Sequence, residues 1–109
     1  MNSIDFSPVV VTTTSDDRLV LEKISYQLIE SQLAACVQIS SPITSYYRWK
    51  GKVETSQEWN CTIKTSLEKF DELQVVILKL HNYDEPQIVA TPIVNGSSGY
   101  LQWLRTSIT

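Results

Sequence analysis

One histidine and the two acidic residues that follow it are the strongest candidates for chemistry in this chain. His81 is the single histidine, and Asp84 and Glu85 lie close behind it. A neutral imidazole binds Cu²⁺ or Zn²⁺ well, and carboxylates can assist as oxygen ligands. These residues predict a weak site for Cu²⁺ or another divalent cation, without an organic cofactor. The alternative is that His81 only interacts with the C-terminal end of a helix dipole.

Other kinds of chemistry lack their usual residues. A structural zinc site takes four ligands, and neither CxxC nor HxxxH spacing occurs. The chain also has no GxGxxG or GxxxxGK[ST] phosphate loop. Cys36 and Cys61 are too few for a disulfide scaffold, and we interpret both as small buried side chains. We therefore expect a binding or regulatory protein that is not an enzyme.

Length and charge narrow the class of protein further. The chain has 109 residues, which predicts one domain over 1–109. Twelve acidic against nine basic residues give a net charge of −3, which disfavours a nucleic-acid partner or a basic membrane-surface helix. No apolar run reaches the roughly 20 residues of a membrane span, and the first residues do not resemble a signal peptide. We expect a cytoplasmic protein.

Hydrophobic patterns in the first half predict a strand, a helix and a hairpin. The β-branched run 8–14 predicts a strand buried on both faces. Ser15 is the expected cap of an amphipathic helix that ends near residue 32. Two alternating segments, 36–49 and 52–65, are the expected arms of a hairpin that turns at Lys50-Gly51.

The second half repeats the order of helix and strand. A capping box, Thr65 to Glu68, opens a helix that closes at His81-Asn82, with Asn82 in the left-handed cap position. Residues 87–94 follow as a strand, and a helix ends the chain. The order βαββαβ plus a C-terminal helix is that of an α+β, ferredoxin-like fold with an antiparallel sheet.

The central hairpin is too long for its own sheet. Each arm would span about 45 Å, whereas the first strand covers only about 20 Å. The far half carries Tyr46, Tyr47 and Trp49, and leaving these rings in water would invite aggregation. We predict that another subunit covers them. The alternative is a hairpin that folds back on its own domain at Pro42.

The register of this hairpin predicts an irregularity. A turn at Lys50-Gly51 would place Cys61 opposite Ser40, which puts the apolar residues of the two arms on opposite faces. A slip by one residue reunites them. We therefore predict a bulge near Pro42, and no disulfide between Cys36 and Cys61.

Five short motifs resemble the CutA divalent-cation tolerance family. They are Leu33-Ala34-Ala35-Cys36-Val37, Tyr47-x-Trp49-x-Gly51-Lys52, Ile63-Lys64-Thr65, His81-x-Tyr83-x-x-Pro86 and Tyr100-Leu101-x-Trp103. The resemblance implies a trimeric ferredoxin-like protein, similar in plan to the PII signalling proteins, with a link to copper and other divalent cations. It also implies a possible protein partner of unknown identity, and no established reaction.

The resemblance adds a second candidate site and leaves alternatives open. Lys64, Tyr83 and Trp49 are expected to line a cleft between subunits; the alternatives are a solvated Lys64 and rings that only pack at the trimer contact. Where family members carry Pro and Glu, this chain has Asn82 and Gln87, which weakens any carried-over metal site. Glu54 and Glu58 are expected on an exposed strand face.

Three rival functions follow from the same residues. The first is a PII-like sensor that binds an anionic metabolite between subunits. The second is a structural trimer that acts as a scaffold. The third is an acylphosphatase-like hydrolase, whose basic anion cradle is disfavoured here because Ser15-Asp16-Asp17 is acidic.

Overall fold

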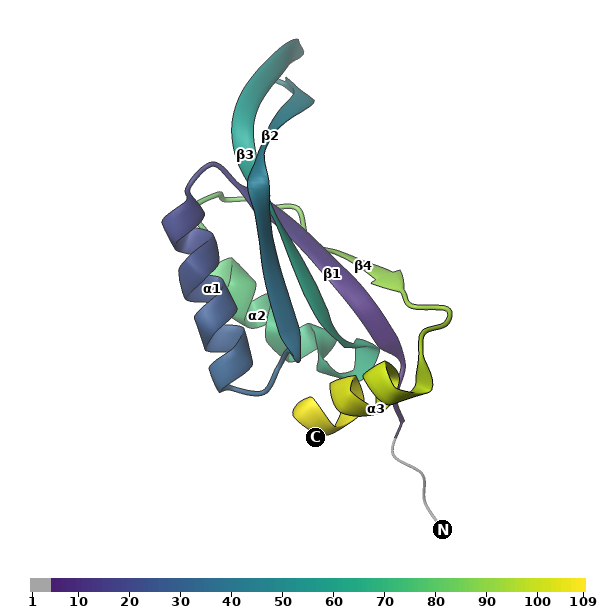
Figure 1. Cartoon of the computed structure of the whole chain (residues 1–109). Coiled ribbons are helices and arrows are strands. Elements are labelled where there is room, and N and C mark those ends of the chain that lie inside the picture. Colours follow the sequence, from purple (N-terminus) through teal and green to yellow (C-terminus); the bar gives the residue numbers. More distant parts are fainter. Residues whose placement is uncertain (1–4) are drawn as a thin grey trace.

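A computed structural model describes residues 5–109 (Figure 1). The elements are β1 (Pro8–Ser15), α1 (Arg18–Glu30), β2 (Cys36–Trp49), β3 (Lys52–Ser66), the short 3₁₀ helix η1 (Leu67–Lys69), α2 (Phe70–Leu80), β4 (Val89–Pro92) and α3 (Ser98–Ser107). The strands form one antiparallel sheet in the order β2-β3-β1-β4. This confirms the predicted ferredoxin-like fold. Within residues 5–109 no helix is both long and apolar enough to cross a membrane.

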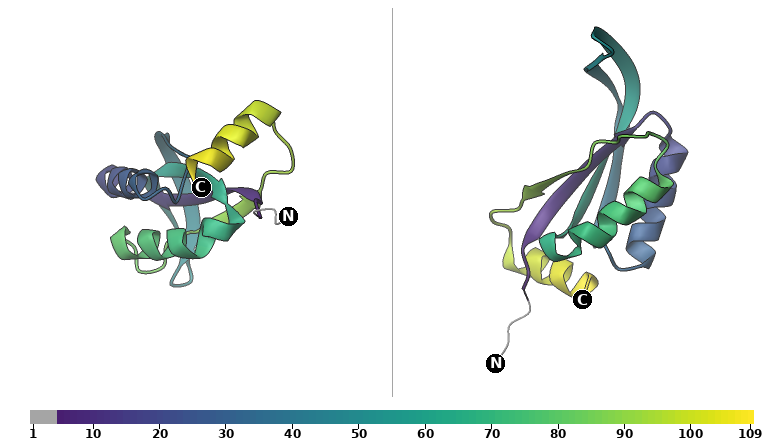
Figure 2. Two further views of the ribbon diagram at one scale, coloured as in Figure 1. Left: turned by 90° about the horizontal axis from the view of Figure 1, so that it is seen from below. Right: turned by 180° about the vertical axis from the view of Figure 1, so that it is seen from behind.

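The core lies between one face of the sheet and the helices α1 and α2. Leu21, Ile24 and Leu28 of α1 are fully buried, as their spacing predicts, and Leu73 and Ile77 of α2 join them. Seen along the strands, α2 and α3 lie on opposite sides of β1 (Figure 2). The sheet is therefore covered by α1 and α2 on one face and only in part by α3 on the other.

This arrangement corrects the prediction that β1 is buried on both faces. Its residues alternate along the whole strand: Val9, Val11, Thr13 and Ser15 are buried, and the residues between them are only half-buried. The buried set faces the two helices. The other set faces the more open side of the sheet. Burial therefore alternates from residue to residue, although the sequence of the strand is a continuous β-branched run.

The predicted helix ends also need correction. Ser15 belongs to β1, and Asp17 is the N-cap of α1, where its side chain accepts from Leu19 N. The expected capping box does not form, because Thr65 Oγ1 donates to the Leu33 carbonyl and Glu68 accepts from Ser7 N.

The end of α2 differs from the prediction as well. His81 leaves the helix in an extended conformation, with φ −68° and ψ 148°. Asn82 is not in the left-handed region; among the described non-glycine residues only Gln32 and Lys50 are. The last strand is four residues long, shorter than the predicted 87–94. The residues that follow α2 are held instead by side-chain hydrogen bonds to Thr14 of β1 and Glu58 of β3.

The hairpin projects beyond the rest of the sheet, as predicted (Figure 1). The pairing of β3 with β1 ends at Trp59 and Ser15, so within residues 5–109 the hairpin beyond this point pairs only with itself. The molecule consequently measures 55 × 25 × 23 Å. Tyr46 and Trp49 remain 74% and 60% exposed within one chain, so the hairpin does not fold back over them.

The turn and the bulge are where the sequence predicts them. Lys50 and Gly51 have φ of 50° and 78°, the left-handed values of a two-residue type I′ turn. The register shifts by one residue between Ile39, which pairs with Cys61, and Pro42, which pairs with Trp59. Cys36 pairs with Lys64, and both cysteines are free.

Candidate functional site

The segment after α2 is fixed by the ring of His81. Tyr83 N donates to His81 Nδ1 at 3.0 Å, so Nδ1 is an acceptor and carries no proton. The proton therefore lies on Nε2, which donates to the Thr14 carbonyl at 2.8 Å. Both ring nitrogens have a partner, and the ring ties this segment to the end of β1.

Tyr83 extends the attachment to the base of the hairpin. Its hydroxyl donates to Glu58 Oε2 at 2.6 Å and accepts from Asp16 N at 2.9 Å. Burial, together with the neighbouring Glu58 carboxylate, raises the pKa of Tyr83 well above its ordinary value. The phenol therefore stays protonated and available as a donor across the physiological range.

The prediction that Glu58 lies on an exposed strand face is wrong. The Glu58 side chain is only 7% exposed, whereas Glu54 further along β3 is exposed as predicted. The difference arises because Tyr83 covers β3 at Glu58 and does not reach Glu54. A buried carboxylate needs hydrogen-bond donors, and Tyr83 supplies one.

Asn82 completes this polar network. Ser15 Oγ donates to Asn82 Oδ1 at 2.6 Å, and Asn82 Nδ2 donates to Asp16 Oδ1 at 2.8 Å. Asn82, which stands where family members carry Pro, thus joins the end of β1 to the segment after α2. The network gives the segment 81–83 a defined position over β1 and β3.

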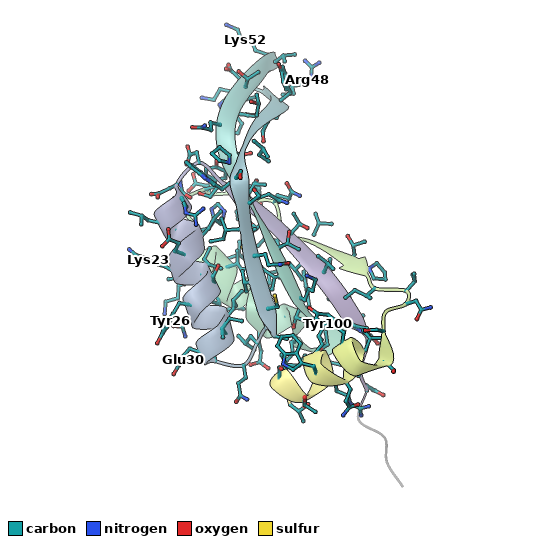
Figure 3. All side chains as sticks on the ribbon, viewed as in Figure 1. Lys23, Tyr26, Glu30, Arg48, Lys52 and Tyr100 are labelled. Atoms are coloured by element: carbon teal, nitrogen blue, oxygen red, sulfur yellow. The ribbon has the colours of Figure 1, made fainter. Side chains whose placement is uncertain are left out.

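A pocket of about 630 Å³ lies between this segment and the hairpin; we call it the hairpin pocket. Its lining residues are Thr14, Ser45, Tyr46, Tyr47, Trp49, Glu58, Tyr83, Asp84, Glu85 and Gln87. They include three carboxylates and four aromatic rings but no lysine or arginine. Basic residues occur instead at the hairpin tip, where Figure 3 shows Arg48 and Lys52.

The pocket brings together most of the residues that the sequence singled out. Trp49, Tyr83, Asp84 and Glu85 line it, and so do the predicted interface residues Tyr46 and Tyr47. His81 is not among its lining residues. Lys64 is not either, because it lies on the sheet and donates to Gln38 Oε1 at 2.8 Å. Within one chain, Lys64 therefore does not share a cleft with Tyr83 and Trp49.

Sequence reasoning missed several residues of the pocket. The alternation along the strand predicts a surface position for Glu58, and no sequence pattern marks Thr14, Ser45 or Gln87 as lining residues. The strand register of the hairpin predicts that Ser45 and Glu58 lie on one face. Glu58 pairs with Ile43 and therefore shares a face with Ser45 and Tyr47.

The predicted metal ligands do not form a closed metal site. In the part of the chain that the structure describes, no three His, Cys, Asp or Glu side chains are grouped so that they could hold a metal ion. His81 could coordinate a metal only by giving up a hydrogen bond to Thr14 or to Tyr83. The residues thus do not fit a tight, preformed site at His81, Asp84 and Glu85.

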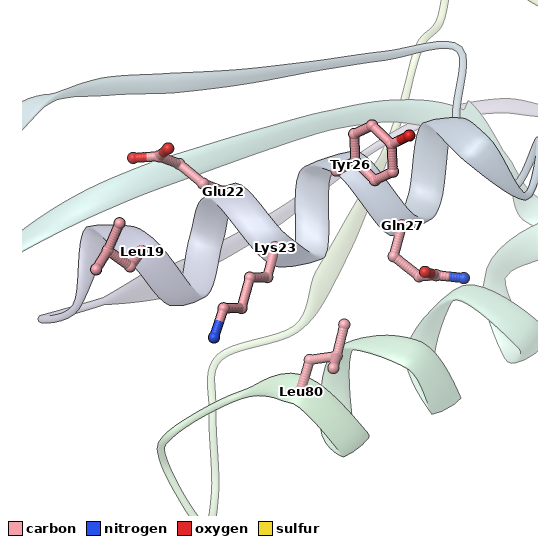
Figure 4. A pocket seen from close by; sticks show the side chains of 6 residues that line it. All are labelled: Leu19, Glu22, Lys23, Tyr26, Gln27 and Leu80. Atoms are coloured by element: carbon pink, nitrogen blue, oxygen red, sulfur yellow. The ribbon is translucent and has the colours of Figure 1, made fainter.

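A second hollow lies between α1 and α2 (Figure 4). Its volume is about 480 Å³, and it is lined by Leu19, Glu22, Lys23, Tyr26, Gln27 and Leu80. It carries one acidic and one basic side chain and is open to solvent. It offers no convergent polar groups, so the hairpin pocket is the stronger candidate site.

Fold and site together define a class: a ferredoxin-like domain whose projecting hairpin carries an aromatic and acidic pocket. The sequence model described as "CutA1 divalent ion tolerance protein" matches residues 9–107. The chain belongs to the CutA family of divalent-cation tolerance proteins. This family is named for cation tolerance and not for a reaction.

Individual relatives agree with this assignment. The divalent-cation tolerance protein CutA of Thermus thermophilus is 42% identical over 97 residues, which cover 89% of this chain and 92% of the relative. The chloroplastic protein CutA of Arabidopsis thaliana is 37% identical over 91% of this chain, which spans 54% of that longer protein. The crystal structure of CutA1 from Oryza sativa superposes with a TM-score of 0.92 at 36% identity and 98% coverage of both chains.

Proposed function

We propose that this chain is a homotrimeric binding or regulatory protein of divalent-cation tolerance, with no catalytic role, and that the hairpin pocket is its ligand site. The observation that carries the proposal is the pocket itself, in which three carboxylates meet four aromatic rings at the base of the hairpin. Such convergent groups in a concave site are the usual mark of ligand binding. Residues 1–109 would form one domain that acts in the cytoplasm.

The trimer is supported by what the isolated chain leaves exposed. Tyr46, Tyr47 and Trp49 lie on the part of the hairpin beyond β1 and are all exposed within residues 5–109. The tip carries Arg48, Lys50 and Lys52, all exposed, whereas the pocket at its base is acidic. A basic tip and an acidic base favour head-to-tail contact between copies of the chain. Such contacts can close into a ring of subunits.

The cation is proposed to be Cu²⁺, which leads the divalent series in affinity for nitrogen and oxygen ligands. Asp84 and Glu85 are exposed at the pocket and accessible as oxygen ligands. His81 would join them after releasing one of its two hydrogen bonds. That release costs free energy, so we expect weak binding, near micromolar, with little effect on folding.

Calorimetric titration with Cu²⁺ tests this proposal on the wild type, on His81→Ala and on the double variant Asp84→Asn/Glu85→Gln. Weaker binding by His81→Ala and by the double variant is the expected result. Equal binding by all three proteins would remove these residues from the metal site, and no binding by any would refute the metal proposal.

A second candidate is a sensor of a small organic ligand, and the size of the pocket favours it. About 630 Å³ is within the range of small-molecule sites and far exceeds what a bare ion fills. The PII-like form of this candidate takes an anion and uses Lys64, which a neighbouring subunit would have to bring to the pocket. A scaffold trimer, or a trimer that holds an unidentified protein partner, would need no small ligand at all.

A further inference from the structure

The loop between β4 and α3 carries the one Asn-Gly pair of the chain, Asn95-Gly96. Both residues are exposed, and the backbone from 93 to 97 belongs to no helix or strand. The loop extends outward beyond β4 (Figure 1). Glycine has no Cβ, so nothing on Gly96 itself shields its backbone nitrogen. Solvent and the side chain of Asn95 therefore both have access to that nitrogen.

The side chain of Asn95 is already folded towards the nitrogen of the next residue. Gly96 N donates to Asn95 Oδ1 at 2.9 Å, so the carboxamide carbon is one bond away from an atom in contact with this nitrogen. Attack of the nitrogen on that carbon closes a succinimide ring within the chain. Groups that are held together in one molecule react far faster than separate ones. The geometry thus places the two reacting groups side by side.

The other asparagines that the structure describes lack this arrangement. The carboxamide of Asn82 is engaged at both ends, by hydrogen bonds to the end of β1 and to the residue after it. The nitrogen that follows it, Tyr83 N, donates to the ring of His81 and not to Asn82. Asn60 lies inside β3, which pairs with β1 on one side and with β2 on the other. Asn95 is therefore the described asparagine whose geometry favours ring closure.

We infer that Asn95 is a site of spontaneous deamidation, a slow covalent modification that consumes water and needs no enzyme. Solvent hydroxide takes the proton of the Gly96 nitrogen, which then attacks Asn95 Cγ. The new N–Cγ bond forms as the Cγ–Nδ2 bond breaks, and the amide group takes a proton from water and leaves as ammonia. Water then opens the ring. Cleavage of the new bond gives aspartate, and cleavage of the original backbone bond gives isoaspartate, whose main chain runs through the former side chain.

The modification acts on α3, because Asn95 and Gly96 lie directly before its N-cap, Ser97. A Cβ added at Gly96 would lie 3.3 Å from Leu101, so the loop is packed against the first turn of the helix. Isoaspartate lengthens the backbone by one methylene group at this point. Since α3 is held to the rest of the domain through the buried Leu104, a longer backbone should disturb the start of the helix. The added negative charge alone should not, because helix N-termini favour it.

Ageing of the full chain in its solution assembly, followed by tryptic digestion and mass spectrometry, tests this inference. The expected peptide, residues 80–105, holds both Asn82 and Asn95, so one measurement compares them. Asn95 should gain about 1 Da and give two separable isomers, while Asn82 stays unmodified. The rate should rise about tenfold from pH 7 to pH 8, because a base must remove the Gly96 proton. The variant Asn95→Gln should lose the modification.

Four outcomes would count against this account. An unmodified Asn95, or equal modification of Asn82 and Asn95 in the folded protein, would overturn the inference. Aspartate without isoaspartate would indicate direct hydrolysis and refute the ring mechanism. The variant Asn95→Asp carries the charge on a normal backbone and should unfold in urea like the wild type, whereas the purified isoaspartate form should unfold at lower urea concentration. Equal loss of stability in both would refute the role of the longer backbone.

Discussion

At the scale of single residues, Glu58 and Tyr83 form the contact on which the candidate site depends. The sequence showed a tyrosine in a family-like motif and a glutamate in an alternating strand, but nothing that joined them. Twenty-five positions separate the two residues, and their contact depends on how the segment after α2 crosses β3. Alternation predicts which face a strand residue occupies, but it cannot predict which loop will cover that face.

Replacing Tyr83 by Phe tests how much this contact stabilises the fold. The change removes the donor to buried Glu58 and the acceptor for Asp16 N while keeping the ring. Hydrogen bonds to charged groups contribute about 1.5–3 kcal/mol, so the free energy of unfolding should fall by about 2 kcal/mol in urea titration. Tyr26→Phe is the control, because Tyr26 is 71% exposed on α1. Equal stability of the two variants would show that the contact contributes nothing.

The two cysteines differ more than the sequence suggested. Cys61 is fully buried, as interpreted, but Cys36 is only half-buried. Burial raises the pKa of the Cys61 thiol from its ordinary value of 9.0 to about 11. The folded chain therefore holds this proton more tightly than the unfolded chain does.

The raised pKa of Cys61 predicts a loss of stability in alkali. A raised pKa contributes stability that is fully present below pH 9 and is lost as the pH rises towards 11. The free energy of unfolding should fall by about 1.4 kcal/mol per pH unit in this window, with a further loss from Tyr83 at higher pH. Urea titrations of the wild type and of Cys61→Ala at pH 8, 9 and 10 would measure it. A slope that persists unchanged in Cys61→Ala would assign the effect to other groups.

At the scale of elements, the hydrophobic patterns were more reliable than the end signals. The helical stripe of Leu21, Ile24 and Leu28 is buried as predicted, and the turn and bulge of the hairpin lie at the expected residues. The burial of a helix face depends on many apolar side chains at once, so one polar residue among them does not change which face is buried. A cap depends on one hydrogen bond, and a single residue can shift it: Ser15 Oγ accepts from Asp17 N, one step before the helix, while Asp17 itself accepts from Leu19 N.

The N-terminus of α1 gives a direct test of the corrected cap. Asp17 Oδ1 accepts from Leu19 N at 3.0 Å, so Asp17→Ala should lower the free energy of unfolding by about 1 kcal/mol. Asp17→Asn keeps an acceptor of the same shape and should cost much less. Thermal and urea unfolding of both variants would measure the difference. Similar losses in both would mean that the charge matters more than the cap.

At the scale of the whole molecule, the order of the elements and the projecting hairpin could be predicted, but the pocket could not. Counting residues along 36–65 was sufficient to show that the hairpin outruns β1. The pocket lies between the hairpin and the segment after α2, and the position of that segment is set by contacts with distant parts of the chain. His81 lies behind the lining of the pocket, because its ring is hydrogen-bonded to Thr14 and Tyr83, which both line it.

The mass of the protein in solution tests most directly whether the exposed hairpin joins three copies of the chain into a trimer. Multi-angle light scattering at micromolar concentration should give about three times the chain mass of 12.4 kDa. The double variant Tyr46→Ser/Trp49→Ser should shift the mass towards one chain, whereas Tyr26→Ser, an equally exposed ring on α1, should leave it unchanged. A wild-type mass of 12.4 kDa across this concentration range would contradict the account.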